Sequence, residues 1–221
     1  MSMKRLAALA VVALAGVSAA LAKSDDHEKR EKMREVRAEK GRARVIESQG
    51  CPPGTFNIVT SPDGSSVSVL FDNFTVSTSA SGFVRKTCAM EIPLQLPAGY
   101  SLGVYQLDYR GFAQLQDRQR GELQVNYGTG AGERNRGRRF RRDVRGAYEG
   151  DFTFNERLRG GVLRRMGCGG SQVLNFAATL TLASRSGAVE GRMTLDTIDG
   201  APAGGLVFGL NLKRCGEPES D

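Results

Sequence analysis

The chain has 221 residues, a formal net charge of +7, one histidine and no tryptophan. The histidine, His27, lies in a strongly charged segment near the N-terminus, so the rest of the chain has no imidazole that could act as a base or bind a metal. Serine or cysteine nucleophiles activated by histidine are therefore excluded from the folded domain.

The first 22 residues have the three parts of a secretory signal peptide. Lys4 and Arg5 form the positive part, an alanine-rich apolar run follows, and Ala20-Leu21-Ala22 has the small–large–small pattern of a cleavage site. The apolar run is at or below the roughly 17 residues that a spanning helix needs. We therefore expect cleavage after Ala22, a secreted protein (extracellular or periplasmic) and no integral membrane segment after cleavage.

Residues 23–50 form a charged segment with nine basic and seven acidic residues and few apolar ones. Ser24 can cap a helix that ends at Gly41. Met33 and Val36 are too few to form a buried stripe. We interpret 23–50 as a tether that is partly helical or disordered, because such a composition buries too little apolar surface to offset its ordering entropy. A partner-binding helix or electrostatic arm is the alternative.

From residue 51 onward the chain alternates between short β-branched or aromatic runs and turns rich in glycine, with no helical period of useful length. Pro93 indicates that its strand is an edge strand. Many strands without helices are typical of a sandwich or barrel. We predict one all-β domain over 51–215, a jelly-roll-like two-sheet β-sandwich of about nine or ten strands, followed by a tail over 216–221. The expected strands cover 55–60, 66–71, 74–77, 91–96, an extended pair within 100–116, 122–127, 147–154, 173–182, 188–195 and 206–213.

Four cysteines follow the signal: Cys51, Cys88, Cys168 and Cys215. An exported chain meets an oxidising compartment, so two disulfides are expected, and the wide spacing argues against a zinc site of four thiolates. Four cysteines allow three pairings. Cys51–Cys88 and Cys168–Cys215 are favoured because each closes a local block at one end of the domain.

Six blocks follow one another along the chain: "GCPPGTF", "SPDGSSVSVLFDNF", "RKTCAMEIPLQLPAGYS", "LDYRGFAQL", "CGGSQVLNFAATLTL" and "FGLNLKRC". Over about Gly50 to Cys215 the chain resembles the secreted family called domain of unknown function 4360. The resemblance implies a small exported domain of bacteria and fungi, and it implies no reaction or catalytic residues. The charged tether and an arginine-rich segment depart from the family pattern.

That segment, "GERNRGRRFRRDVRG", is predicted to be a glycine-rich loop that carries seven arginines. Arginine forks bind phosphate, sulfate or carboxylate through paired hydrogen bonds. Two interpretations stay open: a solvated, disordered loop between two strands, and an anion-binding site for an extracellular polyanion, namely lipopolysaccharide, an acidic polysaccharide or nucleic acid. A dibasic processing site is a third. The arginines are Arg134, Arg136, Arg138, Arg139, Arg141, Arg142 and Arg145.

Three functional classes follow. We favour a non-catalytic binding module for the cell envelope or an extracellular anionic polymer. The second is a polysaccharide hydrolase with two carboxylates, although no pair is singled out and the lack of tryptophan weakens a sugar cleft. The third is a structural or inhibitor-like domain that binds protein through an exposed apolar patch. No catalytic residue, metal site or cofactor is predicted; the carboxylates considered are Asp108, Glu122, Glu149, Asp151, Asp196 and Asp199.

Overall fold

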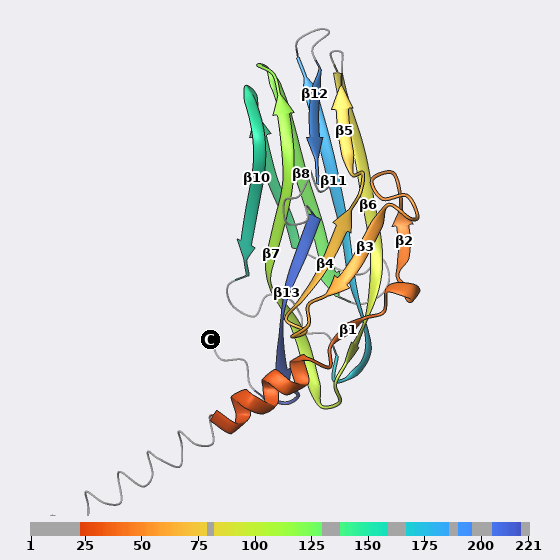
Figure 1. The fold of residues 1–221 in the computed structure, drawn as a ribbon, viewed down its shortest axis with the longest axis vertical. Helices are drawn as coiled ribbons and strands as arrows, with labels where there is room; N and C mark the ends of the chain where they lie inside the picture. The colour runs from red at the N-terminus through yellow and green to blue at the C-terminus, as the bar shows by residue number, and fades with distance from the viewer. Residues whose placement is uncertain are drawn as a thin grey trace, which may run out of the picture.

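Thirteen strands form two antiparallel sheets that pack face to face (Figure 1). The computed structural model describes residues 23–78, 82–129, 138–158, 167–185, 190–195 and 205–217. The predicted two-sheet β-sandwich with two disulfides is confirmed, with more strands than the nine or ten expected. The predicted signal peptide and the end of the predicted tail lie outside the described residues.

The first sheet has the strand order β1-β6-β11-β8-β9, and β2 also pairs with β6. Its longest ladder joins β6 to β11 over fifteen residue pairs, from Gly82 opposite Ser184 to Leu96 opposite Gly170. The strands are β1 (Arg37–Ala38), β2 (Arg44–Glu47), β6 (Gly82–Leu96), β8 (Gln119–Thr129), β9 (Arg138–Arg145) and β11 (Gly170–Ser184).

The second sheet has the order β3-β4-β13-β7-β12-β5, and β10 pairs with the free side of β7. In both sheets, strands far apart in sequence lie side by side, as β13 does between β4 and β7. The strands are β3 (Phe56–Thr60), β4 (Ser66–Phe71), β5 (Thr75–Thr78), β7 (Tyr100–Leu115), β10 (Tyr148–Arg157), β12 (Gly191–Thr194) and β13 (Gly205–Arg214).

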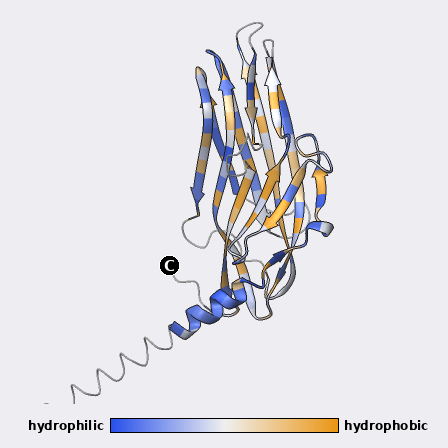
Figure 2. Ribbon diagram, in the orientation of Figure 1, coloured by the Kyte–Doolittle hydropathy of each residue, from blue (hydrophilic) through white to orange (hydrophobic). Residues whose placement is uncertain are grey.

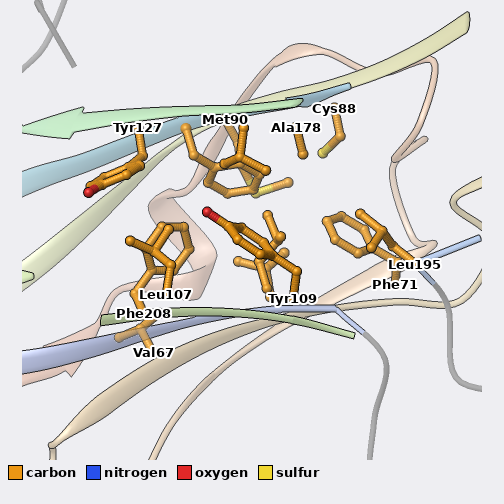
Figure 3. Close-up of a cluster of buried hydrophobic side chains, with 14 of the residues drawn as sticks. Val67, Phe71, Cys88, Met90, Leu107, Tyr109, Tyr127, Ala178, Leu195 and Phe208 are labelled. Atoms are coloured by element: carbon orange, nitrogen blue, oxygen red, sulfur yellow. The ribbon is translucent and has the colours of Figure 1, made fainter. Parts of the chain in front are cut away.

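The core lies between the two sheets and follows the two-residue period of the strands (Figure 3). In β4, for example, Val67, Val69 and Phe71 are fully buried, and the residues between them are partly exposed. Tyr109 of β7 and Tyr127 of β8 are among the largest fully buried side chains. Each strand thus presents one face to the core, which leaves the other face of each sheet for solvent or a ligand.

Part of the segment predicted as a tether is folded onto the sandwich. Residues 23–33 form a hydrophilic helix at one end of the domain (Figure 2). After it, Val36 is fully buried, and the strands β1 and β2, separated by the 3-10 turn η1 (Lys40–Arg42), pair with β6. The composition argument missed these strands because their backbone bonds to β6 do not require an apolar sequence.

The expectation that Pro93 marks an edge strand is wrong, since β6 lies between β1 and β11. The carbonyl of Pro93 accepts a hydrogen bond from the Glu39 amide at 2.8 Å, between the residues of β6 that pair with β1 and those that pair with β2. The side of Pro93 on which an N–H would point faces the gap between β1 and β2. No hydrogen bond of the sheet is therefore lost there.

The two disulfides have the predicted pairing. Cys51–Cys88 ties the segment before β3 to the middle of β6, and both residues are fully buried in the core. Cys168–Cys215 ties the segment before β11 to the end of β13, and both residues are more exposed. The two bonds close loops of 37 and 47 residues, respectively.

We predict that the two disulfides differ in their contribution to stability. Closing loops of these lengths adds about 4 kcal/mol each to the free energy of unfolding. The variant C51A/C88A should lose more than C168A/C215A, because it also removes two sulfur atoms packed in the core. Urea unfolding of both variants measures the difference. An equal or larger loss in C168A/C215A would contradict this assignment.

Candidate functional site

The outer face of the first sheet is built from small and polar side chains in register across five strands. One cross-strand row starts at Glu47 of β2 and ends at Arg139 of β9, with Ala89, Ala177 and Asn126 between them. The next row consists of Thr87, Thr179, Gln124 and Arg141. The two rows run side by side, at right angles to the strands.

The central residues of these rows form the floor of an open hollow of about 820 Å³. Arg139 and Arg141 lie beside the hollow, where the two rows continue onto β9. The floor is low because the central strands carry only methyl and hydroxyl groups there. Thr87 and Thr179 are nearly buried, and their hydroxyls are 3.1 Å apart in a hydrogen bond. Longer side chains form the walls; the lining residues are Glu47, Gln49, Phe83, Val84, Arg85, Thr87, Gln124, Asn126, Ala177 and Thr179.

Phe83, near the start of β6, is the most exposed large apolar side chain in the described part of the chain. It is 69% exposed and lines the hollow together with Arg85, two residues further along the same face. A phenyl ring this open costs free energy in water, so a ligand that covers it gains from its burial.

Five of the seven arginines lie in an edge strand of this sheet, not in a loop. Arg138, Arg139, Arg141, Arg142 and Arg145 belong to β9, which pairs with β8; Arg134 and Arg136 lie outside the described residues. Two residues of the strand face the core and hold it in place: Phe140 stacks on Tyr127 with ring centroids 5.6 Å apart, and Val144 is buried. Two apolar residues among arginines were too weak a signal for a strand.

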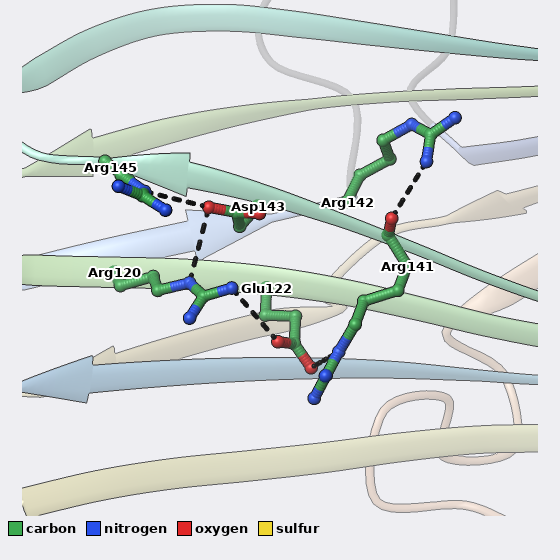
Figure 4. Close-up of polar contacts among 6 residues, drawn as sticks. All are labelled: Arg120, Glu122, Arg141, Arg142, Asp143 and Arg145. Atoms are coloured by element: carbon green, nitrogen blue, oxygen red, sulfur yellow. Dashed lines mark hydrogen bonds and ion pairs between the residues drawn. The ribbon is translucent and has the colours of Figure 1, made fainter.

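The outward side chains of β8 and β9 form a network of ion pairs (Figure 4). Glu122 accepts from Arg141 Nε at 2.9 Å, and Asp143 pairs with Arg120 at 3.3 Å and with Arg145 at 3.1 Å. The hydrogen bond from Arg145 holds the pKa of Asp143 below its usual range, against a smaller opposing effect of burial. Asp143 therefore stays ionised and holds the arginines in place.

Arg139 belongs to the same face and is held differently. Its Nε donates to Asn126 Oδ1 at 3.1 Å. A guanidinium held through Nε still has the N–H groups of its two terminal nitrogens as donors. Arg139 and Arg141 are exposed, and each continues one of the two rows of the hollow. The arrangement can bind an anionic group at the β9 end.

Arg142 points the other way, into the seam where β9 and β10 lie at the edges of the two sheets. Its Nη2 forms an ion pair with Glu156 of β10, a residue that is 8% exposed.

Two buried tyrosines have hydroxyls that are hard to ionise. Burial, followed by the negative charge of Glu156, raises the pKa of the Tyr109 hydroxyl, and burial raises that of Tyr127. Both phenols stay protonated in the folded protein far into the alkaline range.

The structure distributes the described carboxylates considered for hydrolysis over the two sheets. Glu122 lies on the outer face of the first sheet, whereas Asp108 lies in β7 of the second sheet, where it accepts hydrogen bonds from Gln106 and Asn155. Glu149 and Asp151 share an exposed face of β10. Asp196 and Asp199 lie outside the described residues. Among the described candidates, Glu122 and Asp108 cannot act on one bond, because they are on different sheets.

The sequence reasoning missed the hollow, although a signal for it is present. Asn175, Ala177, Thr179 and Thr181 alternate with the buried residues of β11 and are all short or polar. Short side chains along one strand leave a low surface where the neighbouring strands carry longer ones. The position of the neighbouring strands, which turns the short side chains into a floor, depends on pairing that sequence periodicity does not specify.

These observations define the class of the protein: a β-sandwich with two disulfides and a polar hollow on one face. Residues 46–215 match the family described as Domain of unknown function (DUF4360), and the chain belongs to that family. An uncharacterized secreted protein of Arthroderma benhamiae is 26% identical over 157 residues, which cover 68% of this chain and 62% of the relative. The match thus spans less than two thirds of the length of that relative.

Solved structures give only remote likenesses. The carbohydrate-binding module TmCBM61 in complex with β-1,4-galactotriose is 12% identical, with a TM-score of 0.26 over 81% of this chain and 86% of that chain. The family 11 carbohydrate-binding module from Clostridium thermocellum, in complex with a mixed-linked tetrasaccharide, is 9% identical, with a TM-score of 0.22 over 78% and 86%. Likenesses at these scores say nothing about what this chain binds.

The part of the chain that the structure describes includes no helix with the length and apolar character needed to cross a bilayer.

We predict that the buried phenols make the protein labile to alkali. Above about pH 10 an unfolded tyrosine loses its proton while the buried one keeps it, so the free energy of unfolding falls by up to about 1.4 kcal/mol per pH unit for each phenol. The variant Y109F/Y127F should lose less stability between pH 9 and about 11 than the wild type. Urea unfolding across this range measures the difference, and parallel curves would contradict the prediction.

Proposed function

We propose that this chain is an exported, non-catalytic binding module that holds an acidic polysaccharide across the outer face of its first sheet. The observation that carries the proposal is the hollow itself, whose floor consists of hydroxyl, methyl and amide groups. The register places two exposed arginines, Arg139 and Arg141, directly beside Asn126 and Gln124 of that floor. The face combines groups that suit sugars with groups that suit a carboxylate or sulfate.

The neutral part of the hollow suits sugar hydroxyls. Gln124 and Asn126 can donate and accept hydrogen bonds at the floor's β8 side, and Gln49 can do so at the β2 side. Phe83 offers an aromatic face to the apolar side of a sugar ring. The hollow is open and crosses the strands, a shape that accepts an extended chain better than an enclosed small molecule.

The charged part favours an anionic polymer. The outward residues of β8 and β9 include four arginines, Arg120, Arg139, Arg141 and Arg145, against two acids, Glu122 and Asp143. Four positive and two negative charges leave an excess of two on this part of the face. Since these side chains are exposed, their attraction for a polyanion should weaken as salt is added.

Export is supported independently of the site. The predicted signal peptide, with cleavage after Ala22, and the secreted relative both support an extracellular or periplasmic location. The two disulfides are the kind of bond that forms and persists in an oxidising compartment. A polysaccharide of the cell envelope or the surroundings of the cell is a ligand that such a location offers.

We predict that Arg139 and Arg141 are needed for retention on an acidic polysaccharide. The variant R139S/R141S should bind immobilised polygalacturonate about tenfold more weakly than the wild type, because two exposed ion pairs are lost. The control variant R110S/R157S removes the same charge from exposed positions on the second sheet and should bind as the wild type does. Affinity electrophoresis or biolayer interferometry at two salt concentrations gives the comparison.

Neutral dextran serves as the reference polymer. Equal losses in the two variants would mean that net charge alone draws the protein to the polymer, and the proposed site would then be wrong. Circular dichroism of each variant checks that the sandwich is intact, since the ion pairs removed are exposed and contribute little to folding.

A further inference from the structure

The charges of the hollow are unevenly placed along its length. Glu47 stands at the β2 end and Arg139 at the β9 end of the same cross-strand row. Arg85 stands on the wall formed by β6, next to Phe83. The hollow therefore has cations at two places and an anion at one end.

The floor between the two cationic places carries no charge. It consists of Thr87, Thr179, Ala177 and the amides of Gln124 and Asn126. The hydroxyls of Thr87 and Thr179 already bond to each other, and both residues are at most 7% exposed. A carboxylate lying over this floor would give up water and gain no positive partner, which costs free energy.

The spacing of the cations follows from the sheet. Arg85 belongs to β6 and Arg139 to β9, which are three strand spacings apart. The register also offsets them along the strands, because the row of Arg85 reaches β9 at Asp143, four residues from Arg139. At about 4.8 Å for each strand spacing and about 3.3 Å for each residue, the backbones of Arg85 and Arg139 are about 20 Å apart, diagonally across the sheet. A carbohydrate chain that crosses this distance places several sugar residues over the neutral floor.

We infer that the ligand is a polysaccharide in which acidic residues are separated by neutral ones, in preference to a uniformly acidic chain. This inference rests on the proposed function. The acidic residues lie at Arg85 and at Arg139 with Arg141, and the neutral residues lie over the threonines. Glu47 repels an acidic residue at the β2 end, so it selects against a chain that is charged at every residue.

The test compares two acidic polymers of different charge spacing. Hyaluronan alternates one acidic and one neutral residue, and polygalacturonate is acidic at every residue. Wild-type protein should bind hyaluronan more tightly than polygalacturonate at equal ionic strength, by about fivefold, the factor that one exposed ion pair amounts to. Isothermal titration with short fragments of each polymer measures the ratio without avidity.

The variant E47K tests whether Glu47 selects against a uniformly acidic chain. It should tighten binding of polygalacturonate and bring the ratio of the two affinities close to one. E149K makes the same charge change on β10 of the other sheet and should leave the ratio as it is. Because Glu47 and Glu149 are both exposed, neither change disturbs the core.

The outcomes separate this inference from the proposed function. If polygalacturonate binds as tightly as hyaluronan, or if E47K leaves the ratio unchanged, the inference is wrong and the binding module stands. If neither polymer binds to the wild type, or if R139S/R141S binds both as well as the wild type does, the proposed function fails and the inference fails with it.

Discussion

The pairing of β6 with β11 along their full lengths is the constraint on which the rest of this molecule depends. It fixes which side of each strand meets the core: Met90 and Leu180 face inward, and Thr87 and Thr179 face outward. A slip of one residue would exchange the two faces and place hydroxyls in the core. The floor of the hollow and the apolar interior are thus two consequences of one register.

Strand β9 joins the stability of the sandwich to its proposed ligand binding. Its inward residues, Phe140 and Val144, attach it to the core, and Arg142 reaches the buried carboxylate of Glu156 across the seam. Its outward residues extend the two rows of the hollow. Glu122 and Asp143 hold the outward arginines in a fixed arrangement, which lowers the entropy lost when an anionic group binds to them.

The features that sequence analysis predicted were those set by local pattern. The strands β4 and β11 lie where runs of β-branched, aromatic and apolar residues predicted them, and the cysteine pairing followed from the blocks that it closes. β1, β2 and β9 escaped prediction because charged residues make up half or more of each strand. They are strands because β6 and β8 offer them backbone partners, a fact of tertiary structure that no short window contains.

The candidate site was predicted only in part, for the same reason. The arginines stood out by composition, so an anion-binding role could be proposed without any structure. Their position beside a neutral floor could not, because Thr87, Ala177 and Asn126 come from three strands widely separated along the chain. In the fold, the outward arginines of β9 lie along one side of the mostly uncharged hollow.

The arginines of β9 have a further consequence for how two copies of the molecule meet. Within the described residues, β9 is the last strand of its sheet, and its outer edge is open to pairing with another chain. Two molecules that approached edge to edge would bring Arg139, Arg141 and Arg145 against their own copies, and the repulsion opposes growth of a fibre. The charge that suits the proposed ligand thus also disfavours pairing between two β9 edges.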